Sequence, residues 1–286
     1  MGRAGVLGRV LIAGCGYVGA ALAAQLTADG HEVFGLRRRV ASLPDDVAAV
    51  EADLSLPGTL GVLPEGLDFV VYMAGPAGRD DALYRLAYVE GLRNLLAALE
   101  GRAESPRRIF FVSSTAVYAQ RRGEWVDERS LAEPDHFGGR RLREAEELLL
   151  ASRFAGTLVR FGGIYGPRRT RLVERVRTGS ATYSAGGPHY TNRIHRDDCA
   201  GALRHLMGLD APGKLYLGVD CEPADEARVL RWLAGSLGAP PPRQAPKERA
   251  ERGSKRCRND LLLSTGYEFR YPSFREGYAA LLAREI

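Results

Sequence analysis

The feature that most constrains the fold of this chain is a glycine-rich turn close to its start. The apolar run Val10–Ala13 leads into Gly14-Cys15-Gly16-Tyr17-Val18-Gly19, and an alanine- and leucine-rich segment continues to Ala28. Asp29-Gly30 ends that segment, and a second apolar run covers Glu32–Leu36. The pattern predicts a strand, a tight turn, a helix and a second strand, which together form a compact βαβ unit.

Apolar runs and helical patterns alternate further along the chain. Strands are predicted at Asp68–Tyr72, Ile109–Ser113 and Thr157–Phe161, and helices at Leu83–Leu99 and Arg140–Ser152. Strands that are continuously apolar and alternate with helices favour a parallel sheet covered on both faces. The right-handed crossover rule then favours a doubly wound α/β sheet, the Rossmann type.

The glycine spacing within the βαβ unit indicates a site for a dinucleotide. Gly14 permits the tight turn, Gly16 lets the backbone approach a pyrophosphate, and Gly19 lets the helix pack closely on the strand. The start of the helix, predicted over Ala20–Ala28, presents backbone amides and a positive dipole end to the phosphates, and Tyr17 and Val18 of the turn are expected to contact the cofactor. A structural turn without a ligand is the alternative, but the strand before the turn and the helix after it favour the dinucleotide.

The end of the second strand indicates which dinucleotide binds. NAD sites normally carry an acidic residue there, which accepts hydrogen bonds from the ribose. This chain instead has Arg37 and Arg38, followed by Arg39, and no carboxylate. A guanidinium can clasp a 2′-phosphate, so we expect NADP, with NAD as the second choice and a solvated basic loop as the alternative. Asp53 and Leu54 are expected to frame the adenine.

Composition excludes several classes of protein. The 286 residues are 45% hydrophobic and 26% charged, which is typical of a globular chain with about two folding units. The four cysteines lie far apart without a CxxC pair, so we expect neither a disulfide framework nor a metal site. No apolar run is long enough for a membrane span or a signal segment, so a cytoplasmic protein without a membrane partner is expected.

A polar, proline-rich stretch at Ala239–Asn259 is expected to be an exposed excursion. Its arginine-rich part, Arg243–Arg258, raises the possibility of nucleic-acid binding. However, Glu248 and Glu251 interrupt the positive charge, and this part has no aromatic residue for base stacking. The net charge of the chain is only +5. We therefore expect a small-molecule substrate and no nucleic-acid partner.

Five further segments carry a resemblance to a known family. They are Tyr72-Met73-Ala74-Gly75-Pro76, Val89–Leu96, Phe111–Tyr118, Arg160–Pro167 and Asn192–Asp198. With the glycine turn, they make residues 10 to about 280 resemble the extended short-chain dehydrogenase/reductase superfamily, in its NAD(P)-dependent sugar-nucleotide epimerase/dehydratase group. Within that superfamily the chain is most similar to the small atypical members, the YeeZ-like group.

The resemblance implies further cofactor residues. Ala74, Gly75 and Pro76 would lie in the cofactor-facing loop that follows the fourth strand. Asn94 would take a structural or proton-relay position on the central helix, and Ser113 would contact the cofactor from the fifth strand. We expect residues 1–165 to form the NAD(P)-binding domain and residues 166–286 a smaller substrate lobe, part of which could return to the core.

The family's catalytic residues are matched only in part. The family uses a Ser or Thr, a Tyr, and a Lys four residues after the Tyr; the tyrosine exchanges a proton with the substrate hydroxyl while the nicotinamide takes hydride. Ser114 matches the first residue, although a hydroxyl that caps a strand end is an equal alternative. Residues 134–147 contain neither Tyr nor Lys. Aligning Glu144 with the family's glutamate places His136 and Arg140 in the Tyr and Lys positions.

Two alternatives remain open at these positions. A register one residue later would place Phe137 and Arg141 there, and phenylalanine cannot transfer a proton. Histidine can, so His136 could act as the acid/base, although a loop histidine ahead of a helix is the favoured interpretation. Arg140 could hold the cofactor ribose as a hydrogen-bond donor, but arginine does not titrate as lysine does.

The substrate site is expected around Tyr165, Arg193 and His195. Arg193 could bind a carboxylate or phosphate, whereas Tyr165 fits packing equally well. Asp197 and Asp198 are interpreted as helix-start residues. Gly163 replaces an asparagine that contacts sugar nucleotides in the family, which suggests a wider or more mobile wall.

Two functions follow from the sequence. The first is an NADP-preferring, epimerase/dehydratase-like oxidoreductase that works without the Tyr/Lys pair on a sugar nucleotide or a related hydroxy compound. The second is a catalytically inactive NADP(H)-binding sensor or regulatory protein, which the missing pair supports. The identity of the substrate and the oligomeric state do not follow from the sequence.

Overall fold

The computed structural model of the chain describes residues 8–245 and 253–283, which fall into two compact units. Unit 1 comprises Met1–Val117, Ala132–Arg160 and Ala200–Tyr216. Unit 2 comprises Tyr118–Leu131, Phe161–Cys199 and Leu217–Ile286. Each unit is thus assembled from several segments. We expected residues 1–165 and 166–286, with part of the second stretch able to return to the core, and Ala200–Tyr216 belongs to unit 1.

Unit 1 is built on a seven-stranded sheet with the order β12-β7-β5-β4-β1-β2-β3. Its strands are β1 Arg9–Ala13, β2 Glu32–Arg37, β3 Ala48–Glu51, β4 Phe69–Tyr72, β5 Arg108–Ser114, β7 Gly156–Phe161 and β12 Leu215–Gly218. β1 lies between two parallel neighbours, with Val10 opposite Val33 of β2 and Phe69 of β4. From β1 the sheet grows in both directions, which confirms the doubly wound α/β fold.

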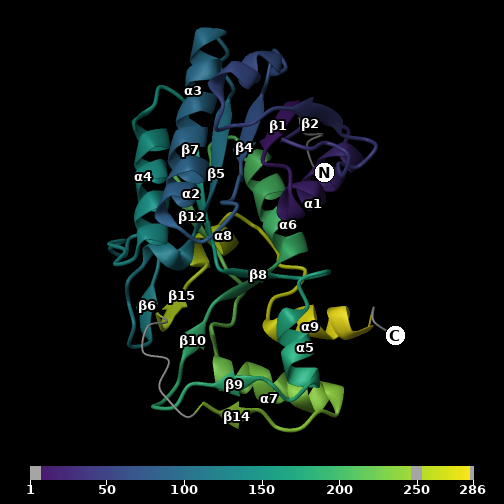
Figure 1. The fold of residues 1–286 in the computed structure, drawn as a ribbon, viewed down its shortest axis with the longest axis vertical. Helices are drawn as coiled ribbons and strands as arrows, with labels where there is room; N and C mark the ends of the chain where they lie inside the picture. Colours follow the sequence, from purple (N-terminus) through teal and green to yellow (C-terminus); the bar gives the residue numbers. More distant parts are fainter. Residues whose placement is uncertain (1–7, 246–252, 284–286) are drawn as a thin grey trace. The chain divides into compact units, whose positions relative to one another are not determined.

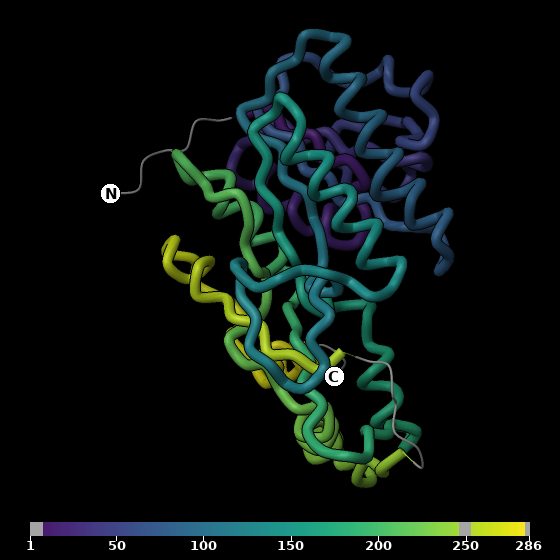
Figure 2. Tube along the Cα trace, turned by 90° about the vertical axis from the view of Figure 1, so that its left-hand side faces the viewer, coloured from purple at the N-terminus to yellow at the C-terminus, as the bar shows by residue number. Residues whose placement is uncertain are grey.

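Helices cover both faces of this sheet (Figures 1 and 2). Those of unit 1 are α1 Tyr17–Ala28, α2 Asp81–Tyr84, α3 Gly91–Gly101, α4 Phe137–Ala151 and α6 Arg196–Met207, which starts in unit 2, with the short 3₁₀ turns η1 Pro57–Val62 and η3 Thr115–Val117. α3 and α4 lie on one face, and α1 and α6 lie on the other. Arg204 of α6 joins Asp29 at the end of α1, with 2.7 Å between Nη2 and Oδ1.

The predicted helix Leu83–Leu99 is interrupted by a π-helical segment, η2 Arg85–Glu90, between α2 and α3. The Tyr72 hydroxyl at the end of β4 donates to the Ala87 carbonyl over 2.5 Å. In an α-helix that carbonyl would accept from the Gly91 amide, which here donates to the Leu86 carbonyl instead. A tertiary contact from the sheet therefore widens the helix by one residue.

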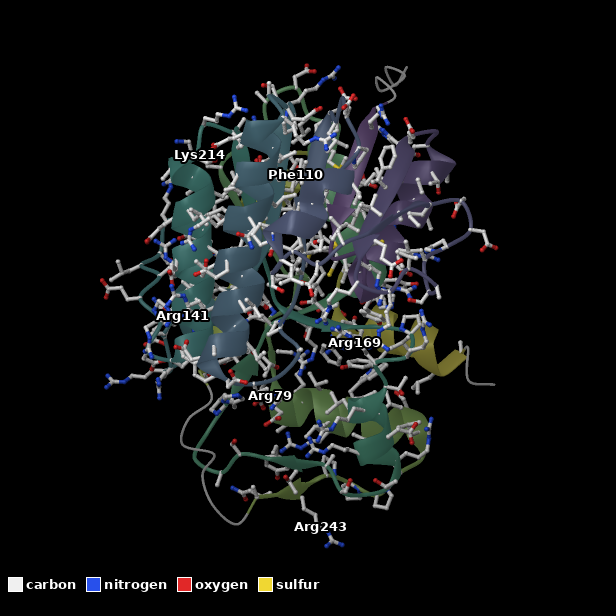
Figure 3. The ribbon with its side chains drawn as sticks, turned by 45° about the horizontal axis from the view of Figure 1, so that its top comes forward. Arg79, Phe110, Arg141, Arg169, Lys214 and Arg243 are labelled. Atoms are coloured by element: carbon white, nitrogen blue, oxygen red, sulfur yellow. The ribbon has the colours of Figure 1, made fainter. Side chains whose placement is uncertain are left out.

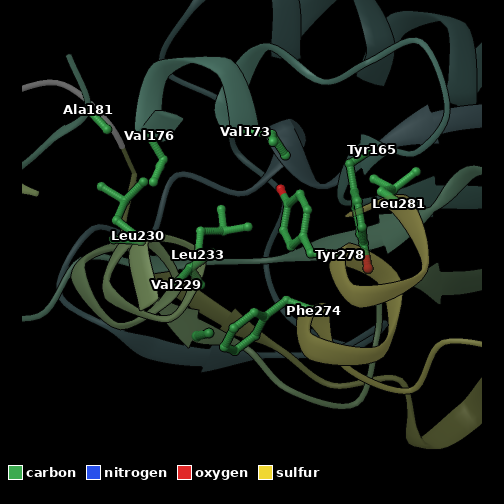
Figure 4. Close-up of a cluster of buried hydrophobic side chains, with 12 residues drawn as sticks. Tyr165, Val173, Val176, Ala181, Val229, Leu230, Leu233, Phe274, Tyr278 and Leu281 are labelled. Carbon is green, nitrogen blue, oxygen red and sulfur yellow. The ribbon is translucent and has the colours of Figure 1, made fainter. Parts of the chain in front are cut away.

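Unit 2 has its own hydrophobic core (Figure 4). Its elements are β6 Glu124–Val126, β8 Gly163–Tyr165, α5 Arg171–Arg177, β9 Thr182–Tyr183, β10 Tyr190–Thr191, β11 Arg193–His195, β13 Ala224–Asp225, α7 Glu226–Leu237, β14 Arg243–Gln244, β15 Lys255–Cys257, α8 Asp260–Ser264 and α9 Phe274–Ala283. Val173 and Val176 of α5 meet Leu233 of α7 and Phe274 of α9 in this core.

The end of the predicted exposed excursion Ala239–Asn259 is in fact structured and buried. β15 pairs in parallel with β6, with Lys255 opposite Glu124. Lys255 and Cys257 are buried, and the Lys255 ammonium donates to the Tyr118 carbonyl over 2.5 Å. The prediction was wrong here because the strand partner lies far away in the sequence; residues 246–252 of the stretch lie outside the described residues.

Candidate cofactor and active site

Two glycines of the turn are required by close packing within unit 1. Gly14 has φ +89°, and a Cβ there would lie 2.5 Å from the Ala74 amide nitrogen. A Cβ on Gly19 would lie 2.9 Å from Met73 Sδ and 3.1 Å from Ile12 Cγ2. No side chain fits at either position, so the turn and α1 can approach β1 and the segment after β4.

Gly16 differs, because the protein leaves the space beside it open. The only atom near a Cβ at this position would be the Gly14 carbonyl oxygen, 3.7 Å away. Gly16 caps α1 without a side-chain hydrogen bond, and the first turn, which begins with Tyr17 and Val18, has no acidic residue. The open space and the uncompensated positive end of the helix fit a phosphate group.

Positive charge lies beside this turn. β2 ends at Arg37, whose Nη1 donates to Ser42 Oγ over 2.5 Å, and Arg38 is exposed after it. Burial raises the pKa of the Cys15 thiol to about 11, against the opposing charge of Arg37. The guanidinium is therefore close enough to act on the turn electrostatically.

The segment after β3 is held in place by polar contacts. Asp53 accepts from the Ser55 amide and hydroxyl, at 2.9 and 2.7 Å. Burial acts to raise the pKa of Asp53, but these hydrogen bonds and the charge of Arg38 outweigh it and lower that pKa. Asn94 on α3 donates to the Leu54 carbonyl over 2.8 Å, so the structure gives it a positioning role for this segment.

The loop after β4 reaches the glycine turn. The Met73 amide donates to the Ala13 carbonyl over 2.9 Å, which continues the ladder between β1 and β4. Ala74 then touches Gly14, and no atom lies within 4 Å of the place where a Cβ on Gly75 would be. Ala74, Gly75 and Pro76 therefore follow β4 at the end of the sheet where the turn lies, and their contact with a cofactor stays a prediction.

Ser113 does not offer its hydroxyl to a cofactor. It is buried and donates to Glu146 Oε1 on α4 over 2.6 Å, and Arg160 binds the same carboxylate at 2.8 and 2.6 Å. Successive strand residues point to opposite faces, so Ser114 points the other way. Ser114 is half-buried and its Oγ accepts from the Ala116 amide over 3.2 Å. We correct the assignment of the Ser113 side chain to a structural one and keep Ser114.

His136 caps α4. Its Nδ1 accepts from the Gly139 amide over 3.1 Å, and its Nε2 lies 3.2 Å from the Ala116 carbonyl. The neutral ring with the proton on Nε2 satisfies both contacts. Because the backbone engages both nitrogens, the geometry favours the structural interpretation of His136 over the acid/base hypothesis.

The two arginines that follow are held by other partners. Arg140 is exposed and its Nη1 donates to the Asp135 carbonyl over 2.9 Å. Arg141, labelled in Figure 3, forms a two-pronged pair with Asp81 at 2.8 and 2.7 Å and also binds Glu144. α4 begins at Phe137, so neither a phenol nor a lysine stands at its start.

Sequence reasoning missed an aromatic cluster at this helix start. The Tyr84 and Phe137 rings meet edge to face, with centroids 5.2 Å apart, and the Tyr88 ring lies 5.6 Å from that of Tyr84. We call these three residues the aromatic cluster. The available signal was the pair of tyrosines four residues apart in a predicted helix, which places them on the same face.

In unit 2, Tyr165 and His195 are core residues. Both are buried, their rings meet edge to face with centroids 5.4 Å apart, and His195 also packs on Tyr271 at 4.1 Å. Their predicted contact with substrate is therefore replaced by packing. Arg193 is half-buried and its Nη1 donates to Thr191 Oγ1 over 2.6 Å, so it is the more accessible of the three predicted residues.

Two further interpretations change in unit 2. Asp198 is more than a helix-start residue, because it is buried and accepts from the Tyr267 hydroxyl and from the Arg270 amide. Gly163 is exposed, and a Cβ there would lie 3.3 Å from the Asn192 carbonyl oxygen, so a side chain would be confined on that one side. Among the described residues, no group of three or more potential ligands is placed to hold a metal ion, and no helix could cross a membrane.

Comparison with known proteins shows the family of this chain. A family model described as NAD(P)H-binding matches residues 14–207. A Streptomyces reductase named 3-diazoavenalumate denitrifying reductase is 31% identical, over 94% of this chain and 98% of its own. Protein YeeZ of Escherichia coli K12 is 29% identical, over 92% of this chain and 96% of its own.

Solved structures extend the similarity. A Methylobacillus flagellatus protein described as an NAD-dependent epimerase/dehydratase has a TM-score of 0.80 and 40% identity, and the match covers 98% of this chain and 99% of that one. The UDP-glucose 4-epimerase of Thermus thermophilus, solved with NAD, shares the fold with a TM-score of 0.79 at 23% identity, over 94% and 96% of the two chains.

The doubly wound sheet and its open glycine turn define a Rossmann protein of the type that binds nicotinamide dinucleotides. The chain belongs to the NAD(P)H-binding family of atypical short-chain dehydrogenase/reductase proteins, within the epimerase superfamily.

Proposed function

We propose that this protein is an NADP(H)-preferring oxidoreductase that works without the Tyr/Lys pair of its superfamily. The observation that carries the cofactor preference is the end of β2, where Arg37 and Arg38 stand in place of a carboxylate. A carboxylate there would repel a 2′-phosphate, whereas two guanidinium groups attract it.

The residues of unit 1 divide the binding between them. The open side of Gly16 and the first amides of α1 would receive the pyrophosphate, and Arg37 and Arg38 would receive the 2′-phosphate. Ala74, Gly75 and Pro76 would border the cofactor, and Asp53 and Leu54 would frame the adenine. When bound, the reduced nicotinamide supplies hydride. Ser114, at the end of β5, would orient the reacting group of the substrate.

The reductive direction is supported by the name of the Streptomyces relative, a denitrifying reductase. The proposed substrate is a sugar nucleotide or a related hydroxy or carbonyl compound. Hydride delivery is the step that needs only the cofactor and a bound, oriented acceptor, so it tolerates the loss of the Tyr/Lys pair better than epimerisation, which needs proton transfer in both directions.

Calorimetric titration with NADP, NADPH, NAD and NADH, on protein freed of copurified nucleotide, tests the cofactor proposal. The double variant Arg37→Ala, Arg38→Ala should lose about tenfold or more in affinity for NADP and NADPH and little for NAD, because charge-assisted hydrogen bonds to the 2′-phosphate are lost. An equal loss for both dinucleotides would contradict the 2′-phosphate assignment.

The matched control removes two arginines from the amino ends of the strands, on the side of the sheet opposite the glycine turn. Arg107 precedes β5 and Arg153 precedes β7, so both lie at the amino ends of parallel strands, away from the glycine turn. Each is about half exposed. The variant Arg107→Ala, Arg153→Ala changes the net charge by the same amount and should leave the preference for NADP intact.

A sensor without turnover is the second candidate, because both nitrogens of His136 are bound to backbone groups. The two functions differ in one measurement. Protein that binds NADPH tightly but never oxidises it, across a panel of carbonyl and hydroxy compounds, would favour the sensor.

A further inference from the structure

The start of α4 has no tyrosine of its own, but two tyrosines from α2 and η2 pack in a row against it. Tyr88 sits on η2, and its ring packs on Tyr84, which in turn packs on Phe137, the first residue of α4. A Cβ on Gly138 would lie 2.9 Å from the Tyr84 ring, so glycine is needed there for the cluster to approach the helix.

The π-helical geometry of η2 is fixed from the cofactor edge of the sheet. Tyr72 ends β4, and its hydroxyl holds the Ala87 carbonyl, one residue before Tyr88. The chain then continues from Tyr72 into Met73 and Ala74, which touches Gly14 of the glycine turn. Tyr88 therefore directly follows Ala87, whose carbonyl accepts a hydrogen bond from the strand that leads into the loop after β4.

The other side of the aromatic cluster is tied to the end of β5. His136, next to Phe137, binds the Ala116 carbonyl, and the Ala116 amide donates to Ser114 Oγ. The cluster is thus linked to both the loop after β4 and the candidate serine. All of these residues belong to unit 1.

The hydroxyls of the cluster are available for a ligand. Tyr72 uses its hydroxyl within the protein, as does Tyr216, which accepts from the Gly213 amide over 2.7 Å. In the described part of the chain, the Tyr84 and Tyr88 hydroxyls make no hydrogen bond, and neither oxygen is enclosed. A half-buried phenol with its ring fixed by packing and its hydroxyl open is suited to meet a polar group of a substrate.

We propose that the Tyr88 hydroxyl donates the proton to the substrate, in place of the tyrosine that α4 lacks. This proposal rests on the proposed function. In the reduction of a carbonyl compound, hydride from the reduced nicotinamide forms the new C–H bond as the C=O π bond breaks. The oxygen takes the proton of Tyr88, the cofactor leaves as NADP, and the phenolate takes a proton from water.

The surroundings of Tyr88 suit a donor. Burial raises its pKa to about 12, and the neighbouring Tyr84 adds to that shift. The phenol therefore carries its proton at neutral pH and can give it to an oxygen on which negative charge develops. The same shift makes the phenolate a poor resting state, so the reductive direction is favoured.

The test labels the protein with 3-fluorotyrosine and follows the ¹⁹F resonances with NADP or NADPH bound. The variants Tyr88→Phe and Tyr84→Phe assign two of the twelve tyrosines, and both keep the ring of the cluster. NADP carries a positive charge on the nicotinamide and NADPH does not. A phenol that faces this ring should titrate about one pKa unit lower with NADP bound.

The expected result is a Tyr88 resonance whose titration differs between the two cofactors, while the Tyr84 resonance responds less. Bound cofactor with an unresponsive Tyr88 resonance would overturn the proposal and leave the proposed function standing. A response confined to Tyr84 would overturn it too. If calorimetry shows no binding of either cofactor, the proposal and the proposed function both fall.

Discussion

Gly16 and Gly14 lie two residues apart in one turn, yet the structure gives them different roles. Gly14 is confined by the backbone of Ala74, whereas Gly16 faces open space. A side chain at Gly16 would therefore compete with a ligand and not with the protein. This contrast at the scale of single residues separates a binding turn from a merely tight one.

Gly16→Asp should abolish dinucleotide binding, with a loss of more than about a hundredfold, because a carboxylate would repel the pyrophosphate in the space it needs. The melting temperature should change little, since no atom lies within 3.4 Å of the new Cβ. Gly14→Ala is the control: its Cβ has no room, so it should lower the melting temperature strongly. Calorimetry and thermal unfolding measure both, and unchanged affinity in Gly16→Asp would contradict the site.

Asp220 in unit 2 gives a prediction on pH. It is 2% exposed, and its Oδ2 has no partner among the described residues. Burial raises its pKa to about 8, against the opposing hydrogen bond from the Glu222 amide and the charge of Arg193; Glu222 and Asp198 add to the rise. The folded state therefore prefers the protonated acid.

The contribution of Asp220 to the free energy of unfolding should be fully present below pH 4. It should be lost as the pH rises to about 8, because the carboxyl ionises in the unfolded chain with the ordinary pKa of 3.8. Asp220→Asn removes the ionisation and keeps an acceptor for the Glu222 amide. Its melting temperature, relative to the unchanged protein, should rise between pH 4 and pH 8 and level off above that. A difference that stays constant with pH would show that Asp220 does not titrate in this way.

At the scale of elements, η2 shows how one side chain sets a helix geometry. The Tyr72 hydroxyl takes the acceptor that Gly91 would use, and a Cβ on Gly91 would lie 2.4 Å from that hydroxyl oxygen. A sheet residue and a helix glycine thus fit each other. Neither is recognisable from helical periodicity, which predicts a single helix over this stretch.

Tyr72→Phe should lower the free energy of unfolding by about 1 kcal/mol, the usual cost of a buried hydrogen bond, and should alter amide exchange at Gly91. Tyr216→Phe is the matched control, because it also removes a buried tyrosine hydroxyl bond, at the Gly213 amide. The control should cost a similar free energy and leave Gly91 exchange unchanged. Unaltered Gly91 exchange in Tyr72→Phe would mean that the hydroxyl does not hold the π-helical geometry.

Other elements follow local signals more closely. β1, β2, β4, β5 and β7 begin and end within one residue of the predicted strands, because continuous apolar runs bounded by turns identify buried parallel strands. α4 begins three residues earlier than predicted, because His136 caps it through Gly139. That cap is a local contact, but histidine is not among the residues that ordinarily signal one.

At the scale of the whole molecule, the chain builds each unit from distant segments. β15 joins β6 across more than a hundred residues, and Asp198 at the start of α6 is held by residues 267–271. These contacts bury polar groups that the sequence pattern predicts to lie in exposed loops. Burial of Lys255, Cys257 and His195 thus depends on partners that no window of neighbouring residues contains.

The sequence by itself determined the fold class, the glycine turn and its cofactor class, because a βαβ unit with fixed glycine spacing is a local pattern read along consecutive residues. It also placed Ser114 at a strand end. Only the tertiary structure decided that Ser113 donates to Glu146, that His136 accepts from a backbone amide, and that Tyr88 packs on the tyrosine that contacts the start of α4. The physical reason is that a side chain's role depends on which groups meet it in space, and chain folding brings those groups together from distant positions.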